Sequence, residues 1–96
     1  MAGVVLTPTA VRSVERLIET HSLPDGTRAR LRRSLEPLAQ FPLIGSQLQG
    51  RWSELRFVLG PWRWMIVVYF YDDETDRVLI VTIQDARSAR AAAAQE

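Results

Sequence analysis

Most of the information about the fold lies in residues 62–84, which read WRWMIVVYFYDDETDRVLIVTIQ. Two runs rich in β-branched and aromatic residues, Trp62–Tyr71 and Arg77–Gln84, are separated by the acidic segment Asp72–Asp76. Runs of this kind favour strands, and a short polar segment between them is typical of a solvated turn. These residues therefore predict a β-hairpin.

A third strand is expected immediately upstream, over Trp52–Leu59. The segment has a period of two, and Gly60-Pro61 ends it as a turn would. Residues 45–50 come before it and are expected to form a loop. The three strands are most simply joined as an antiparallel meander.

The amino-terminal half predicts one strand and two helices. Val4–Thr7 is a short β-branched stretch, and apolar residues then recur at helical spacing over Pro8–Thr20. A second helix is expected from Thr27, with a kink or an end near Pro37 because proline removes a backbone hydrogen bond. Phe41-Pro42 closes this element, and the two helices should pack as an antiparallel hairpin.

The composition agrees with a single folded domain over residues 1–96. The chain is 47% hydrophobic and 24% charged, with a formal net charge of +1, which excludes a disordered chain. The predicted fold class is α+β: an N-terminal strand, a two-helix antiparallel hairpin and then a three-stranded antiparallel meander. Residues 85–96 are rich in alanine and predict a short helix or a frayed tail.

The composition also limits the chemistry. There is no cysteine and only one histidine, which excludes disulfides, thiolate catalysis and cysteine-ligated metals, so we expect no metal and no cofactor. All twelve basic residues are arginine. A guanidinium stays charged, and it suits phosphate or carboxylate recognition better than proton transfer.

The hydropathy pattern predicts a cytoplasmic protein. The longest apolar run, Trp64–Tyr71, is much shorter than the ~20 residues of a membrane-spanning helix. The first residues carry no basic lead of the kind that opens a secretory signal. We therefore expect no membrane partner.

Alternation divides the meander into two faces. The first is almost wholly apolar and is expected to lie against the helices; it consists of Leu55, Phe57, Leu59, Trp62, Trp64, Ile66, Val68, Phe70, Leu79, Val81 and Ile83. The second is half polar; it consists of Glu54, Arg56, Val58, Arg63, Met65, Val67, Tyr69, Ile80, Thr82 and Gln84. A bare face of this kind predicts a docked partner. The alternative is that its arginines only keep an open face soluble, with Glu54 in a cross-strand ion pair.

Two other features are interpreted as surface. His21 lies in the turn between the helices, far along the chain from the strands. Arg28, Arg30, Arg32 and Arg33 form the one dense basic run. We interpret this run as a solvated helix face, with Arg32 paired to Glu36 at i,i+4, rather than as a nucleic-acid footprint.

The order of these features resembles a known family. Phe41-Pro42 and Gly45 precede the meander, Glu54-Leu55-Arg56 opens it, Arg63 stands near the start of its central strand and Arg87 follows its last strand. This arrangement resembles the RelE/ParE superfamily of toxins from type II toxin–antitoxin modules, the plasmid stabilisation family. The resemblance implies a small toxin held inactive by a cognate antitoxin, which lays a helix or an extended segment across it.

The superfamily implies two different activities. Members of the RelE branch cut messenger RNA on the ribosome; here Arg63 and Arg87 would contact the scissile phosphate, with Glu54 as the base. No lysine stands in the opening strand, and no histidine or tyrosine follows Tyr71, so groups for proton transfer are scarce. Members of the ParE branch instead poison DNA gyrase by binding it, without catalysis. We expect this ParE-like mode, with RNA cleavage as the alternative.

A third alternative is a degenerate, non-toxic member that only binds its antitoxin. In each case the surface expected to bind target or antitoxin consists of Arg56, Arg63, Met65, Val67, Tyr69, Arg87 and Arg90. A homodimer and a toxin–antitoxin hetero-oligomer both remain open.

Overall fold

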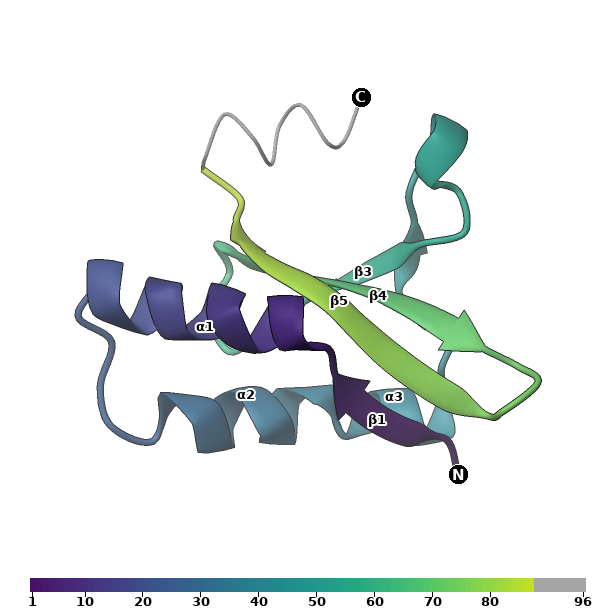
Figure 1. Ribbon diagram of the computed structural model, residues 1–96, viewed down its shortest axis with the longest axis horizontal. Coiled ribbons are helices and arrows are strands. Elements are labelled where there is room, and N and C mark those ends of the chain that lie inside the picture. Colours follow the sequence, from purple (N-terminus) through teal and green to yellow (C-terminus); the bar gives the residue numbers. More distant parts are fainter. Residues whose placement is uncertain (88–96) are drawn as a thin grey trace.

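The computed structural model describes residues 1–87 as a five-stranded sheet with the helices packed against it (Figure 1). The elements in chain order are β1 (Gly3–Leu6), α1 (Pro8–Thr20), α2 (Thr27–Leu35), α3 (Pro37–Gln40), β2 (Ser46–Gln47), the 3-10 turn Gly50–Trp52, β3 (Arg56–Leu59), β4 (Met65–Asp72) and β5 (Arg77–Asp85). The strand order is β1-β5-β4-β3-β2. This is the predicted α+β fold.

The sheet confirms the antiparallel meander and extends it at both edges, but the strand predicted from Trp52 begins only at Arg56, because the chain forms a 3-10 turn at residues 50–52. β3 pairs antiparallel with β4, and β4 pairs antiparallel with β5. β1 joins the meander as a parallel neighbour of β5. The expected loop at residues 45–50 contains the short edge strand β2, which pairs with β3. No helix among the described residues is long and apolar enough to span a membrane.

The helices begin and end as their local chemistry requires. The side chain of Thr7 accepts a hydrogen bond of 3.2 Å from the backbone N–H of Ala10, and Pro8 occupies the first position of α1. The second helical segment divides at Pro37, where α2 gives way to α3. Proline lacks the N–H that would continue the helical bonding, so the predicted kink is confirmed.

The predicted assignment of the two faces is wrong for β3 and β4. Met65, Val67 and Tyr69 are fully buried in the core formed with the helices, together with Val78 and Ile80 of β5. Both faces of β4 are apolar, so the hydrophobic pattern does not distinguish them. Tyr69 can be buried because its hydroxyl accepts a hydrogen bond of 2.9 Å from the N–H of Gly45.

A β-bulge breaks the alternation in β5. Tyr69 is paired with Ile80, but the preceding Val68 is paired with Thr82, which leaves Val81 as an extra residue. Ile80 and Ile83 therefore point to the same core although they are three residues apart. The prediction of a core position is confirmed for Ile83, and the same strict alternation placed Ile80 on the wrong face.

Candidate functional site

Arg63 and Arg87 lie at the same end of the sheet. Met65 is paired with Asp85, and the N–H of Ala86 donates a 2.6 Å hydrogen bond to the carbonyl of Trp64. The turn that carries Arg63 is thereby joined to the segment that carries Arg87. Both arginines are exposed.

Glu54 lies at the opposite end of the meander. It precedes β3, whereas the turn that carries Arg63 follows β3. Roughly 13 Å of strand, at ~3.3 Å per residue, separates Arg56 at the start of β3 from Gly60 at that turn. The structure therefore brings together the two predicted phosphate-binding arginines but does not bring the predicted base to them.

Arg87 is engaged within the chain. Its guanidinium donates to both carboxylate oxygens of Asp85 at 3.0 Å, and its backbone N–H donates to the same carboxylate at 2.8 Å. These bonds, above all the one from the guanidinium, hold the pKa of the Asp85 carboxyl well below its usual range despite partial burial. The pKa of Arg87 is raised by the same pairing. A phosphate would have to compete with this carboxylate for the guanidinium.

His21 belongs to this end of the molecule, and its interpretation as a surface residue is wrong, because it is half-buried against the end of the sheet. Its ring stacks on Trp64 with centroids 4.8 Å apart and an angle of 9°. Its Nε2 lies 2.9 Å from a carboxylate oxygen of Asp85. The turn between α1 and α2 brings it there, and no periodic signal in the sequence reports that approach.

Further stacking connects the cluster of His21, Trp64, Asp85 and Arg87 to α2. Trp62 and Trp64 stack at 6.0 Å, and the guanidinium of Arg30 lies 4.6 Å above the ring of Trp62. The Arg87 guanidinium lies 5.1 Å from the Trp64 ring. The faces of both tryptophan rings thus contact side chains of the same chain, and these contacts join His21 at the end of α1 and Arg30 of α2 to the sheet.

Arg56 and Tyr69 hold the loop between α3 and β2. The Arg56 guanidinium donates to the carbonyls of Leu43 at 3.2 Å and Gly45 at 2.9 Å. Burial raises the pKa of the Tyr69 hydroxyl, whose oxygen accepts the hydrogen bond from the Gly45 N–H. Arg56 is half-buried, in contrast to its predicted place on a bare face.

The other predicted binding residues divide into buried and accessible ones. Met65, Val67 and Tyr69 have no exposed surface, so the prediction that they present a bare face is wrong. Arg63 and Arg87 are accessible, and Arg90 lies outside the described residues. The outer face of the sheet is apolar instead: Phe57, Phe70, Leu79 and Val81 are half-buried, and Val5 and Leu59 are exposed.

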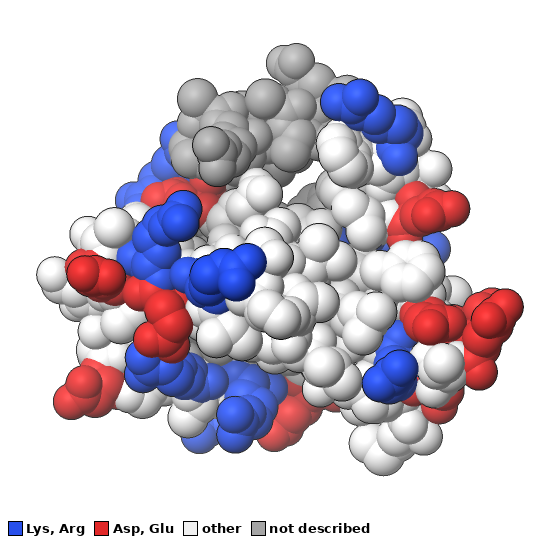
Figure 2. Space-filling model, viewed as in Figure 1, with Lys and Arg blue, Asp and Glu red and all other residues white. Residues whose placement is uncertain are grey.

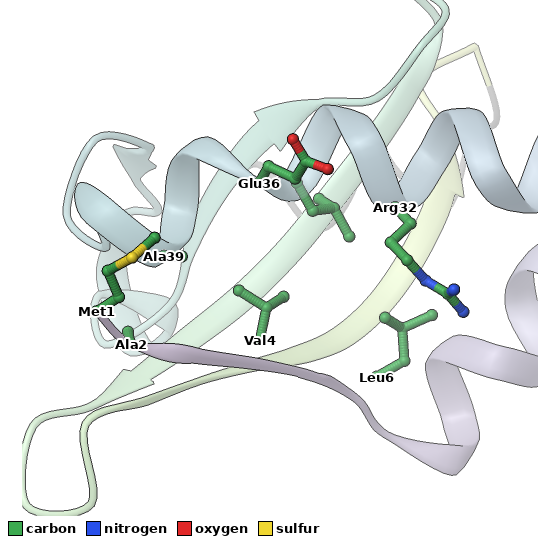
Figure 3. Close-up of a pocket in the computed structure, with 8 residues that line it drawn as sticks. Met1, Ala2, Val4, Leu6, Arg32, Glu36 and Ala39 are labelled. Atoms are coloured by element: carbon green, nitrogen blue, oxygen red, sulfur yellow. The ribbon is translucent and has the colours of Figure 1, made fainter.

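An open apolar groove runs between β1 and the second helical segment (Figure 3). One cavity of about 400 Å³ is lined by Val4 and Leu6 of β1 and by Leu35 and Ala39 opposite, with Arg32 and Glu36 on the same side. A second cavity of about 320 Å³ shares Leu6 and Arg32 and continues toward α1. The groove is suited to an apolar segment of a partner.

Charge is unevenly distributed over the surface. Figure 2 shows basic and acidic side chains intermixed over the helices and a mainly acidic group around the β4–β5 turn, with an uncharged surface between them. On the helices Arg28 forms an ion pair with Glu15. This differs from the expected Arg32–Glu36 pair, which does not occur among the ion pairs of residues 1–87. In the same range no group of three His, Cys, Asp or Glu is placed to hold a metal ion.

Comparison with known proteins relates residues 4–90 to the family described as the ParE toxin of the type II toxin–antitoxin system parDE. A search of curated proteins finds no match. Among solved structures, the chain is similar to one in the RelBE2 toxin–antitoxin complex of Mycobacterium tuberculosis, with 23% identity, a TM-score of 0.65 and coverage of 88% of this chain and 96% of that one.

Two structures from E. coli match this chain with the same TM-score and lower sequence identity. The isolated RelE toxin is 15% identical with a TM-score of 0.65, over 97% of this chain and 93% of that one. A chain of the intact RelBE toxin–antitoxin complex is 16% identical, also with a TM-score of 0.65, over 92% and 100% of the two chains. At these identities the structural likeness concerns the fold.

Proposed function

Because the chain belongs to the ParE toxin family of type II toxin–antitoxin systems, we propose that it arrests growth by binding a protein target such as DNA gyrase, without catalysis. The observation that carries this proposal is the separation of Glu54 from the arginine pair. Cleavage of RNA by its own 2′-hydroxyl needs a group that takes the proton within hydrogen-bond reach of the reacting atoms. Glu54, at the far end of β3, does not meet that requirement beside Arg63.

The engagement of Arg87 supports the same proposal. A phosphate-binding guanidinium stabilises a transition state best when its donors already point at the phosphate. Here the donors point at Asp85, and His21 also contacts that carboxylate. These bonds occupy the Arg87 guanidinium within the chain.

We further propose that a cognate antitoxin covers the apolar surfaces that the chain leaves open. These are the groove beside β1 and the outer face of the sheet. Contiguous apolar surface of this kind favours a docked partner, and a groove lined by β1 and a helix fits an extended or helical segment. RelE chains of this fold occur in complexes with their antitoxins.

The second candidate function is ribosome-dependent cleavage of messenger RNA. The observation that favours it is the joining of Arg63 and Arg87 at one end of the sheet, with Arg63 exposed. Two guanidinium groups at one site can hold a phosphate. This candidate requires both a base from the ribosome and a rearrangement that releases Arg87 from Asp85.

The two functions are separated by examining cells at the moment of arrest. The chain is induced without its antitoxin, and both plasmid supercoiling and the ends of messenger RNA are mapped. Loss of negative supercoiling with intact messages supports the proposal. Cleaved messages that become intact with Arg63→Ala establish the nuclease instead, and normal growth on strong induction establishes a non-toxic antitoxin-binding protein.

A further inference from the structure

The loop between α3 and β2 presents large apolar side chains to solvent. Phe41, Leu43 and Ile44 are 58%, 57% and 61% exposed, the highest values among the large apolar residues of the described chain apart from Met1. We call residues 41–44 the apolar loop. Single exposed apolar residues are ordinary, but three within four positions form a patch that favours a partner.

The backbone of the apolar loop is fixed at both ends. The N–H of Phe41 donates to the Pro37 carbonyl at 2.9 Å, and the N–H of Ile44 donates to the Phe41 carbonyl at 3.0 Å. Beyond these turns, Arg56 binds the carbonyls of Leu43 and Gly45. A loop already held in one conformation loses little entropy on binding, which is the property of an effective interface anchor.

The apolar loop encloses a shallow hollow next to a cluster of carboxylates. The hollow, of about 490 Å³, is lined by the loop and by Tyr71 of β4. The Tyr71 hydroxyl donates a 2.7 Å hydrogen bond to Asp76 in the β4–β5 turn. The acidic residues of that turn are Asp72, Asp73, Glu74 and Asp76, and none of them takes part in an ion pair among residues 1–87.

We infer that the apolar loop and the acidic turn bind the protein target of the toxin. The complementary surface on the target carries a large apolar side chain that fills the hollow, flanked by lysine or arginine that faces the acidic turn. The carboxylates repel nucleic-acid phosphates, so an RNA is the wrong partner for this surface. An antitoxin segment finds a concave seat in the groove beside β1, whereas side chains displayed on a fixed loop match the surface of a folded protein.

This inference rests on the proposed function, and its test uses two sets of exposed substitutions. The first variant is Leu43→Asp with Ile44→Asp, which removes the apolar anchors. The second is Asp73→Lys with Glu74→Lys, which reverses the charge of the turn. The matched control is Trp52→Asp, because Trp52 is also a large exposed side chain, 41% exposed, on a different loop. Thermal unfolding verifies the fold of each variant, and complex formation with the antitoxin is measured separately.

Affinity for purified DNA gyrase and growth arrest are measured for all four proteins. We expect the apolar variant to bind gyrase at least tenfold more weakly and to lose growth arrest. We expect the charge variant to bind several-fold more weakly, most clearly at low salt, and the control to match the original chain. All should still bind the antitoxin.

The outcomes separate the two proposals. If the original chain binds gyrase and both variants bind equally well, the inference is overturned while the proposed function stands. If the original chain arrests growth without binding gyrase, gyrase is the wrong target. Loss of growth arrest in the apolar variant then still supports the inference that the apolar loop binds the target. Retained growth arrest in that variant overturns the inference. If the folded variants lose the antitoxin but keep growth arrest, the surface belongs to the antitoxin and the inference is overturned.

Discussion

The hydroxyl of Tyr69 and the backbone N–H of Gly45 form a 2.9 Å hydrogen bond in the interior of the protein. This bond joins the central strand β4 to the base of the apolar loop. A residue on the buried face of the sheet therefore positions one of the most exposed segments of the protein. Tyr69→Phe leaves the Gly45 N–H without this acceptor and should lower the free energy of unfolding by about 1–3 kcal/mol. Urea unfolding measures the loss, and Tyr71→Phe, whose hydroxyl bonds to an exposed carboxylate, should cost less.

Gly45 itself has no space for a side chain. An added Cβ would lie 2.7 Å from the Phe57 carbonyl oxygen and 2.7 Å from the Tyr69 hydroxyl. Gly45→Ala should therefore destabilise the protein by roughly 1–3 kcal/mol through overpacking. Gly3→Ala is the matched control, because its Cβ would meet only Arg77 at an ordinary 3.7 Å. Equal melting temperatures for the two variants would contradict the close approach of the loop to β3 and β4.

Both tyrosines should titrate late in the folded protein. Burial raises the pKa of Tyr69, and the hydrogen bond to Asp76 raises that of Tyr71. Ultraviolet absorbance should show ionisation above ~10 when the protein is folded and near ~10 when it is unfolded in urea. The neutral phenol of Tyr69 stabilises the fold below its unfolded pKa, and this stability is lost as pH rises through the higher folded value. Tyr69→Phe should reduce that alkaline loss.

The Asp85 carboxylate should give the protein an acid-dependent component of stability. Its pKa is lowered by Arg87 first, with help from His21. The contribution is therefore fully present above the unfolded pKa of ~3.9 and is lost as pH falls toward the lower folded value. Asp85→Asn should lower stability at neutral pH and weaken its decline in acid. Tryptophan fluorescence is a suitable probe, because His21 stacks on Trp64; identical acid curves for both proteins would argue against the pairing.

Glu54 should be dispensable for growth arrest, because it lies at the end of the meander away from Arg63. Glu54→Gln should change the inducer level required for arrest by less than about twofold. Loss of a general base would instead lower the rate of RNA cleavage by about 10²–10⁴. Glu19→Gln, an exposed glutamate on α1, serves as the control. A large effect of Glu54→Gln alone would show that the residue acts in chemistry.

The order of elements follows directly from local chemistry. Thr7-Pro8 starts a helix, Pro37 interrupts one, and the acidic turn ends a strand, because each depends on neighbours in sequence. Which face of β4 is buried in the core, by contrast, does not depend on neighbours in sequence. Both sides of β4 are apolar, and a buried tyrosine becomes acceptable only when the loop at Gly45 folds over it. Gly45 is far from Tyr69 along the chain, and no pattern in the sequence predicts that the two residues meet.

The site is harder to predict than the fold for the same reason. The bulge at Val81 moves Ile83 onto the face of Ile80, and strict alternation has no means of locating such an extra residue. His21 reaches Asp85 only through the packing of α1 against the end of β5. Arg63 and Arg87 are easier to place together, because hairpin connectivity alone brings them to one end of the sheet.

The stoichiometry of gyrase inhibition distinguishes binding from catalysis. Purified DNA gyrase, held well above the dissociation constant, is titrated with the chain while supercoiling of relaxed plasmid is followed. If the chain acts by binding alone, supercoiling activity falls in proportion to added protein and ends at a fixed molar ratio. Full supercoiling at a large excess of the chain, with messenger RNA cut by trace amounts in a purified translation reaction, would contradict it.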